Sequence, residues 1–159
     1  MKIVKIVAAL LVVALLGVAL VAPIGPLPGI FIGGTETPIP DAWGATGDVD
    51  EIKLQVGEGL LPRVVIIWVI QVGGDLHVVG AADSGWTTMI GQGGPVRMRM
   101  GDETFDLQAD QVTVGWQPVL EAYVEKYRAD YPEIIAGFPS IEDAEGTISV
   151  FRLTARGSS

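Results

Sequence analysis

Hydrophobic residues follow three different patterns along the chain, and the first of them lies near the N-terminus. From Ile6 to Val21, sixteen residues carry no charged or polar side chain. A helix of about 20 residues rises roughly 30 Å, which is the thickness of the hydrocarbon core of a bilayer. We therefore expect residues 1–22 to form a single-pass transmembrane anchor that contacts the lipid bilayer through residues 3–22. A cleaved signal peptide is the alternative interpretation of the same run.

The charges and the composition around this run predict how the protein lies in the membrane. Lys2 and Lys5 precede the apolar run, and the next basic residue is Lys53. This asymmetry favours a cytoplasmic N-terminus, with the rest of the chain on the periplasmic or extracellular side. Residues 23–47 are rich in proline and glycine, so they form either a linker or a peptide laid over the domain surface. The apolar residues at 30–32 favour contact with lipid headgroups or with a partner.

The second pattern is the two-residue alternation of β-strands, which opens a domain predicted at residues 48–155, before a short tail at residues 156–159. Ile52, Leu54 and Val56 alternate with polar residues. This alternation is typical of a strand with one face buried and the other in water.

The next strand differs because both of its faces are apolar. Residues 63–72 are rich in β-branched side chains and carry few polar ones, which is typical of a strand covered on two sides. Gly73-Gly74 then predicts a tight turn, and residues 75–81 resume the apolar pattern. The two segments together predict a β-hairpin.

A turn at Gly101-Asp102 sorts the side chains of a second hairpin onto two faces. It pairs Arg97 with Asp106 and Arg99 with Thr104. The apolar members then share the opposite face: Val96, Met98, Phe105 and Leu107. A shift of one residue would place the arginines among these apolar side chains, so the register is well specified.

The third pattern is helical spacing, which occurs twice. Residues 84–92 begin with Ser84 as a candidate N-cap, and residues 117–129 carry Pro118 near their start. Residues 146–154 alternate again and predict a closing strand. The order of these elements predicts a mainly β (α+β) fold, in which antiparallel strands form a small closed or half-closed barrel with two short helices.

Composition then narrows the chemistry that this domain can perform. The chain has 10 basic and 19 acidic residues, which argues against nucleic acid as a partner because phosphates need clustered Lys and Arg. It has no cysteine, which excludes disulfides and thiolate catalysis, and its single histidine excludes a histidine-rich metal centre. No metal site is predicted. The acidic residues near position 50 are expected to form a solvated edge.

One segment carries a family resemblance. Residues 84–111 (SGWTTMIGQGGPVRMRMGDETFDLQADQ) resemble the deazaflavin-dependent nitroreductase family and its relatives in the pyridoxamine-phosphate-oxidase-like split-barrel superfamily of flavin-binding proteins. The resemblance extends over roughly residues 50–155. It implies a split β-barrel that binds FMN or a deazaflavin. The chain departs from the family at residues 57–63 (GEGLLPR), where only Arg63 supplies a cation for a cofactor phosphate.

If such a cofactor binds, its phosphate needs cations and hydroxyl groups, and its ring needs an apolar or aromatic wall. The candidates for the phosphate are Arg63, Ser84, Thr87 and Thr88, and those for the wall are Trp68 and Trp86. Helix capping is the alternative role for the three hydroxyl residues, and core packing is the alternative role for Trp86. The alternative is that the chain binds no cofactor, in which case none of these residues has a cofactor-binding role.

No catalytic residue is assigned from the sequence. His77 faces Ile70 if the first hairpin turns at Gly73-Gly74, so we expect a packing residue, with a general acid–base role as the alternative. Arg97 and Arg99 are expected on a solvated or subunit-facing surface. No Ser/His/Asp set with a nucleophile elbow is present.

Two functions of different classes follow from these patterns. The first is a membrane-anchored split-barrel oxidoreductase of the flavin or deazaflavin type, which passes a hydride or electrons to a small or quinone-like acceptor. The alternative is a non-catalytic accessory subunit or binding module of a membrane protein complex that has lost cofactor binding. A carrier of an apolar molecule inside the barrel is a third option. Other subunits or a second copy of the chain are the expected protein partners.

Overall fold

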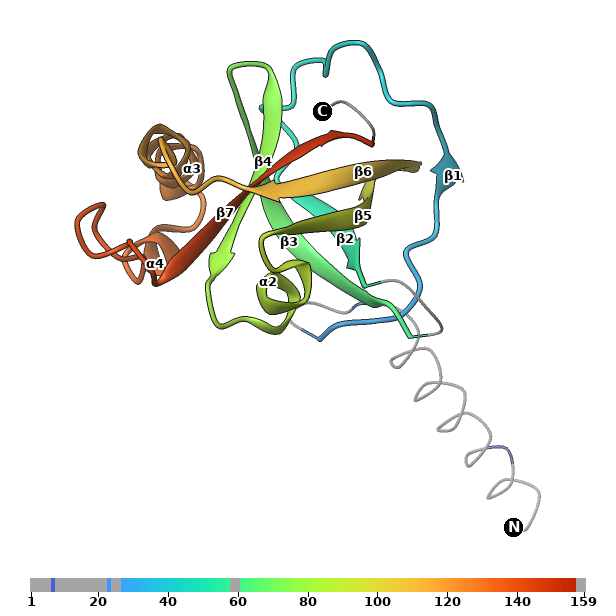
Figure 1. The fold of residues 1–159 in the computed structure, drawn as a ribbon, viewed down its shortest axis with the longest axis horizontal. Coiled ribbons are helices and arrows are strands. Elements are labelled where there is room, and N and C mark those ends of the chain that lie inside the picture. The colour runs from blue at the N-terminus through green and yellow to red at the C-terminus, as the bar shows by residue number, and fades with distance from the viewer. Residues whose placement is uncertain (1–6, 8–22, 24–26, 58–60, 157–159) are drawn as a thin grey trace.

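The computed structural model describes residues 7, 23, 27–57 and 61–156, and β-strands dominate them (Figure 1). Six strands close on themselves in the order β6-β5-β2-β3-β4-β7 and back to β6, each antiparallel to both neighbours. This closed arrangement confirms the predicted small antiparallel barrel. The strands are β2 (Glu51–Val56), β3 (Arg63–Val72), β4 (Asp75–Ala81), β5 (Gly93–Met100), β6 (Glu103–Gln111) and β7 (Ile148–Ala155).

The predicted transmembrane anchor at residues 1–22 lies outside the described residues except for Val7. Within the described part of the chain, no helix is both long enough and apolar enough to span a bilayer. The anchor and the domain boundaries at residues 22, 47 and 155 therefore stay predictions.

Both hairpins have the registers that the sequence predicted. Val72 pairs with Asp75 around Gly73 and Gly74, and Met100 pairs with Glu103 around Gly101. The three glycines have φ values of 62°, 93° and 61°, which residues with a side chain adopt only with strain. Glycine at these positions therefore fixes the turns, and each turn fixes its register.

The barrel interior is a packed core. It holds the apolar face of the second hairpin together with the alternating residues of β2 and the inward faces of β4 and β7: Ile52, Leu54, Val56, Leu76, Val78, Val96, Met98, Phe105, Leu107, Phe151 and Leu153, all 3% exposed or less. On β3, Val65, Ile67 and Val69 face this core, whereas Trp68, Ile70 and Val72 face outward. The predicted coverage of β3 on both faces is confirmed.

Helices cover one outer face and one end of the barrel. α3 (Gln117–Arg128) lies on the outer face of β3 and β4, and its buried stripe packs there: Val119, Leu120, Tyr123 and Tyr127. α2 (Gly85–Ile90) covers an end of the barrel, with Trp86 and Ile90 turned into the interior (Figure 1). A further short helix, α4 (Pro132–Ile135), was not predicted, because four residues are too few to show a helical period.

The segment before the barrel lies on the barrel surface. Gly29 exchanges two backbone hydrogen bonds of 2.8 Å with Val64, and the short strand β1 (Thr35–Glu36) pairs in parallel with the start of β6. We call residues 29–37 the strap. Of the two conformations left open for this region, residues 29–37 adopt the one in which the peptide is laid over the domain.

Candidate functional site

Arg63 lies against α2 at the end of the barrel that this helix covers. A methyl group added at Gly85 would lie 3.1 Å from Arg63 Nη1 and 3.2 Å from Cζ, so the guanidinium lies directly over the Cα atom of Gly85. Thr88 and Met89 follow Gly85 by three and four residues and therefore lie on the same helix face. Met89 Cε in turn lies 2.6 Å from the position of a methyl group added at Gly57. We call these five residues the mouth.

Arg63 differs from the paired arginines of the barrel. Its Nε atom is buried and has no hydrogen-bond partner, and within the described residues no ion pair involves its guanidinium. A buried donor without an acceptor costs roughly 1–3 kcal/mol. Four other arginines each contact a carboxylate within 4 Å: Arg97, Arg99, Arg128 and Arg152.

The predicted hydroxyl groups lie at the start of α2, and backbone atoms occupy most of their hydrogen-bonding capacity. Ser84 is the N-cap, and its Oγ accepts from Thr87 N at 3.5 Å. Thr87 is buried, and its Oγ1 lies 2.8 Å from the carbonyl of Ala81 and 2.9 Å from that of Ser84. Thr88 is exposed and donates to the carbonyl of Ser84 at 2.8 Å, which leaves its oxygen free to accept. The structure therefore brings Arg63 near this segment, with Thr88 as its most accessible hydroxyl.

The two predicted wall residues lie on opposite sides of the barrel wall. Trp86 is 8% exposed and faces the interior, where its ring centroid lies 5.8 Å from that of Phe151. Trp68 lies outside, stacked on Tyr127 at 4.3 Å with an interplanar angle of 15°. The structure does not bring the two rings together, so they cannot enclose one planar ligand between them.

Lys126 and Tyr127 hold α3 in place beside Trp68 through hydrogen bonds that the sequence did not predict. Lys126 Nζ donates to the carbonyls of Val49 at 2.5 Å and Val69 at 3.0 Å. Burial lowers the pKa of Lys126, against the opposing charges of Asp50 and Asp48. The hydrogen bonds of Lys126 and Tyr127 to β3 leave no signal in the sequence, because their partners are backbone atoms, which every residue has.

Tyr127 makes the neighbouring contact. Its Oη accepts from Val69 N at 3.1 Å and lies 2.7 Å from the carbonyls of both Val69 and Asp50. Burial raises the pKa of the Tyr127 phenol, so the group stays protonated and keeps its donor at neutral pH. Lys126 and Tyr127 together join residues 49–50, just before β2, to β3, so both side chains have a structural role in holding α3 on the barrel.

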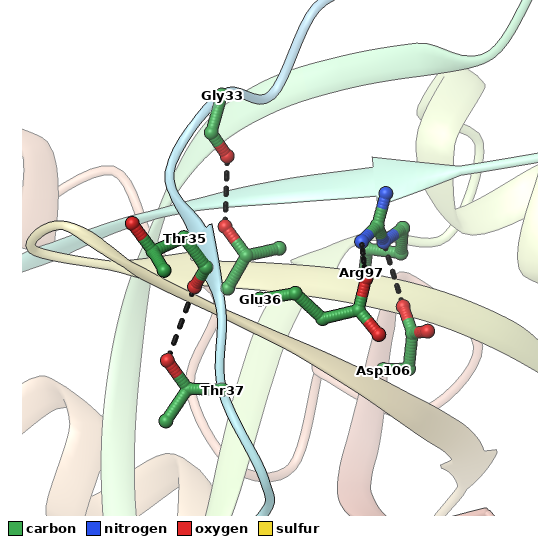
Figure 2. Close-up of polar contacts among 7 residues, drawn as sticks. Gly33, Thr35, Glu36, Thr37, Arg97 and Asp106 are labelled. Carbon is green, nitrogen blue, oxygen red and sulfur yellow. Dashed lines mark hydrogen bonds and ion pairs between the residues drawn. The ribbon is translucent and has the colours of Figure 1, made fainter.

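Arg97 lies on the outer face of the second hairpin, where the strap crosses it (Figure 2). Arg99 also contacts the strap, because its Nη1 donates to the carbonyl of Ile32 at 3.2 Å. Arg97 Nε lies 2.6 Å from Asp106 Oδ1, and its Nη2 lies 3.5 Å from Glu36 Oε2 of the strap. A cleft of about 370 Å³ lies beside these three residues. Both carboxylates already neutralise Arg97, so this cleft is a weaker anion site than the mouth.

His77 pairs with Ile70 on β3, as the register predicted, and it is buried beneath its neighbours. Burial lowers the pKa of His77 below its usual value of 6.5, and the charge of Arg152 adds to this effect, while contacts with Asp75 oppose it. A neutral imidazole whose Nδ1 lies 3.2 Å from the carbonyl of Asp75 is typical of a packing residue.

Two larger cavities lie outside the barrel. One of about 450 Å³ lies between β4, β7 and the loop at residues 137–139, and one of about 600 Å³ runs along α3. Neither is lined by the residues predicted to bind a cofactor. The interior itself is filled by side chains in the described residues, so the structure gives no support to an apolar carrier.

Comparison with known proteins gives a structural likeness. No family model and no curated protein sequence matches the chain. Among solved structures, a NimC/NimA family protein from Clostridium acetobutylicum has a TM-score of 0.49 at 20% identity, covering 65% of this chain and 73% of that one. A putative pyridoxamine 5'-phosphate oxidase from Listeria innocua has a TM-score of 0.49 at 11% identity, covering 69% and 86%. An FAD and heme binding protein from Mycobacterium smegmatis has a TM-score of 0.48 at 12% identity, covering 68% and 62%.

All three identities are below 25% and all three TM-scores are below 0.5. The strand order and register of this chain define its fold, and its own side chains define the candidate site.

Proposed function

We propose that the chain is a membrane-anchored split-barrel protein of the flavin or deazaflavin oxidoreductase type, which holds the phosphate of its cofactor at the mouth. The observation on which this depends is the guanidinium of Arg63, half-buried over Gly85 with an unpartnered Nε. The resemblance of residues 84–111 to flavin-binding split barrels supports the same end of the barrel, because that segment includes α2.

A phosphate group fits the chemistry of Arg63. A guanidinium presents donors in a fixed fork that matches two phosphate oxygens, and a charge-assisted hydrogen bond contributes roughly 1.5–3 kcal/mol. Thr88 adds a hydroxyl on the same face of α2. Glycine at position 85 leaves room for the guanidinium, because a Cβ atom there would lie 3.1 Å from Arg63 Nη1.

The cofactor supplies the redox chemistry when it is bound, and the chain supplies orientation and exclusion of water. Leu61 precedes Arg63 by two residues, Met89 lies about one helical turn beyond Gly85, and both apolar side chains are exposed. They would contact the apolar part of a cofactor or of an acceptor. A small or quinone-like acceptor suits such a surface.

Cofactor titration of the full-length protein in mild detergent tests this function. FMN and a deazaflavin are each added to purified protein, and binding is read from the absorption and fluorescence of the cofactor. Arg63→Ala is expected to weaken binding about 10- to 100-fold, from the loss of roughly 1.5–3 kcal/mol. Arg128→Ala is the matched control, because Arg128 is exposed on α3 and forms an ion pair with Glu125, away from the mouth.

A second function has its own support in the structure. The hydroxyls of Ser84 and Thr87 serve the start of α2, and Trp68 and Trp86 lie on opposite sides of the wall. This arrangement favours an accessory subunit or binding module that retains the barrel without a cofactor. A protein that binds neither cofactor and co-migrates with a larger membrane assembly would support this second function and refute the first.

A further inference from the structure

Large apolar side chains remain exposed at one end of the barrel. Within residues 27–57 and 61–156, seven large hydrophobic side chains are exposed. Two of them, Val114 and Ile134, lie elsewhere. The five at this end are Leu27 at 62%, Ile30 at 42%, Phe31 at 62%, Leu61 at 79% and Met89 at 47%. We call these five residues the foot.

Backbone pairing brings three residues of the foot, Ile30, Phe31 and Leu61, close to one another, and Leu27 lies two residues before the bridge at Gly29. Gly29 and Val64 form an antiparallel bridge, so the residues after Gly29 run beside the residues before Val64. Ile30 and Phe31 therefore lie alongside the segment that contains Leu61. Figure 1 shows this part of the chain passing beneath the barrel, next to the start of β3.

The fifth residue joins the same end through the mouth. Met89 lies on the face of α2 that contains Gly85, and Gly85 lies against Arg63. Arg63 is two residues beyond Leu61 in the chain. Leu61 and Met89 of the foot therefore come close to the mouth from two segments that are far apart in sequence.

The chain itself indicates what covers this surface. The apolar run of the sequence ends at Ala22, five residues before Leu27. Five residues span at most about 18 Å when fully extended, which keeps Leu27 close to whatever surrounds the apolar run. Exposed apolar patches on a protein mark interaction sites, and a patch beside a predicted membrane segment matches the boundary between headgroups and acyl chains.

We infer that the foot docks on the bilayer, with Leu27, Phe31 and Leu61 at the level of the headgroup–acyl boundary. The guanidinium of Arg63 then lies close to the membrane surface rather than in bulk water. An apolar molecule dissolved in the lipid reaches Arg63 by lateral diffusion, and this determines the class of acceptor that the proposed oxidoreductase takes. The docking itself rests on the predicted anchor and not on the proposed cofactor.

The absence of cysteine makes a direct test simple. Leu61→Cys in the full-length chain is labelled with an environment-sensitive fluorophore, and the protein is reconstituted into phosphatidylcholine vesicles that contain lipids spin-labelled in the acyl chain. Ile134→Cys is the matched control, because Ile134 is also apolar and exposed but lies on α4, away from the foot in Figure 1.

Quenching of the Leu61 label ~2-fold or more, with little quenching at position 134, is the expected result for a side chain 5–10 Å into the interface. Phe31→Cys is expected to behave like Leu61→Cys. Equal quenching at positions 61 and 134, or none at either, would overturn the inference. A Leu61 label that is shielded from water but not quenched by lipid would also overturn it, in favour of a protein partner or a second copy of the chain.

The cofactor titration is read independently of this experiment. Failure to retain FMN or a deazaflavin would leave the quenching pattern unchanged, whereas an unquenched foot would leave cofactor binding unchanged. The two proposals therefore fail separately.

Discussion

Replacing Tyr127 by phenylalanine tests the contact that fixes α3 against the barrel. The side chain is 1% exposed, and its hydroxyl bonds to Val69 N, with the carbonyls of Val69 and Asp50 each at 2.7 Å. Phenylalanine keeps the ring that stacks on Trp68 at 4.3 Å. The substitution therefore removes hydrogen bonds while it preserves the packing.

The magnitude follows from counting these bonds. The hydroxyl has one proton, so it donates to one carbonyl at a time and accepts from Val69 N. Two net hydrogen bonds are lost, at roughly 0.5–1.5 kcal/mol each. Val69 N retains only a 3.4 Å contact with the carbonyl of Asp50, which compensates poorly. We expect the free energy of unfolding to fall by about 2 kcal/mol, which lowers Tm by roughly 10 °C in a domain of about 100 residues.

Thermal unfolding of the full-length protein in mild detergent, followed by far-ultraviolet circular dichroism, measures this change. Tyr131→Phe is the matched control, because Tyr131 also packs against Trp68, at 4.6 Å, but no hydrogen bond of its hydroxyl is found among the described residues. Its Tm should change by less than about 2 °C. If the two variants lose the same stability, the hydrogen bonds of Tyr127 do not fix α3, and the reasoning is wrong.

Three further outcomes are expected. Burial lowers the pKa of His77, so as the pH falls below about 6.5 the unfolded chain is protonated at this residue before the folded chain, and the free energy of unfolding should fall. His77→Gln should remove this dependence and flatten the curve of Tm against pH between about 6.5 and the folded pKa. Thr104→Val removes the 2.7 Å bond to the carbonyl of Gly33 and should free the strap, measured as faster amide hydrogen exchange at residues 33–37 with a loss of about 1–2 kcal/mol; unchanged exchange would contradict it. Gly80→Ala should destabilise the domain by about 1–3 kcal/mol in the same thermal assay, because the added methyl would meet the ring of Trp86; a neutral result would mean that this ring moves freely.

The strand registers could be predicted because they depend on local signals. A two-residue alternation sorted Arg97 and Met98 onto opposite faces, and glycine at position 101 marked the turn. The strap could not be predicted as part of the sheet, since its two-residue strand β1 shows no period. Thr104 shows the consequence. The pattern placed it on the polar outer face, where it does lie, but the strap buries it to 2% exposure.

The candidate site was less predictable, for two physical reasons. β3 is apolar on both faces, so no alternation indicated that Trp68 faces outward. The hydroxyl of Thr87 could serve a ligand or the backbone, and only the position of the Ala81 carbonyl at 2.8 Å decides between them. Arg63 stood out in the sequence as the lone cation of its segment, and the structure leaves it without a carboxylate partner among the described residues.

The mouth and the foot share Met89, so the proposed cofactor site and the proposed membrane contact lie next to each other. Arg63 has no carboxylate partner among the described residues, so its guanidinium favours an anionic ligand, whereas the exposed side chains of Leu61 and Met89 favour an apolar environment. A ligand with a phosphate at one end and a planar ring at the other meets both requirements, and so does a phospholipid, through its phosphate and its acyl chains. Cofactor retention that is lost in Arg63→Ala and survives excess phospholipid would assign the guanidinium to the cofactor. Competition by phospholipid would instead make Arg63 part of the membrane contact, and the barrel an accessory module on the bilayer surface.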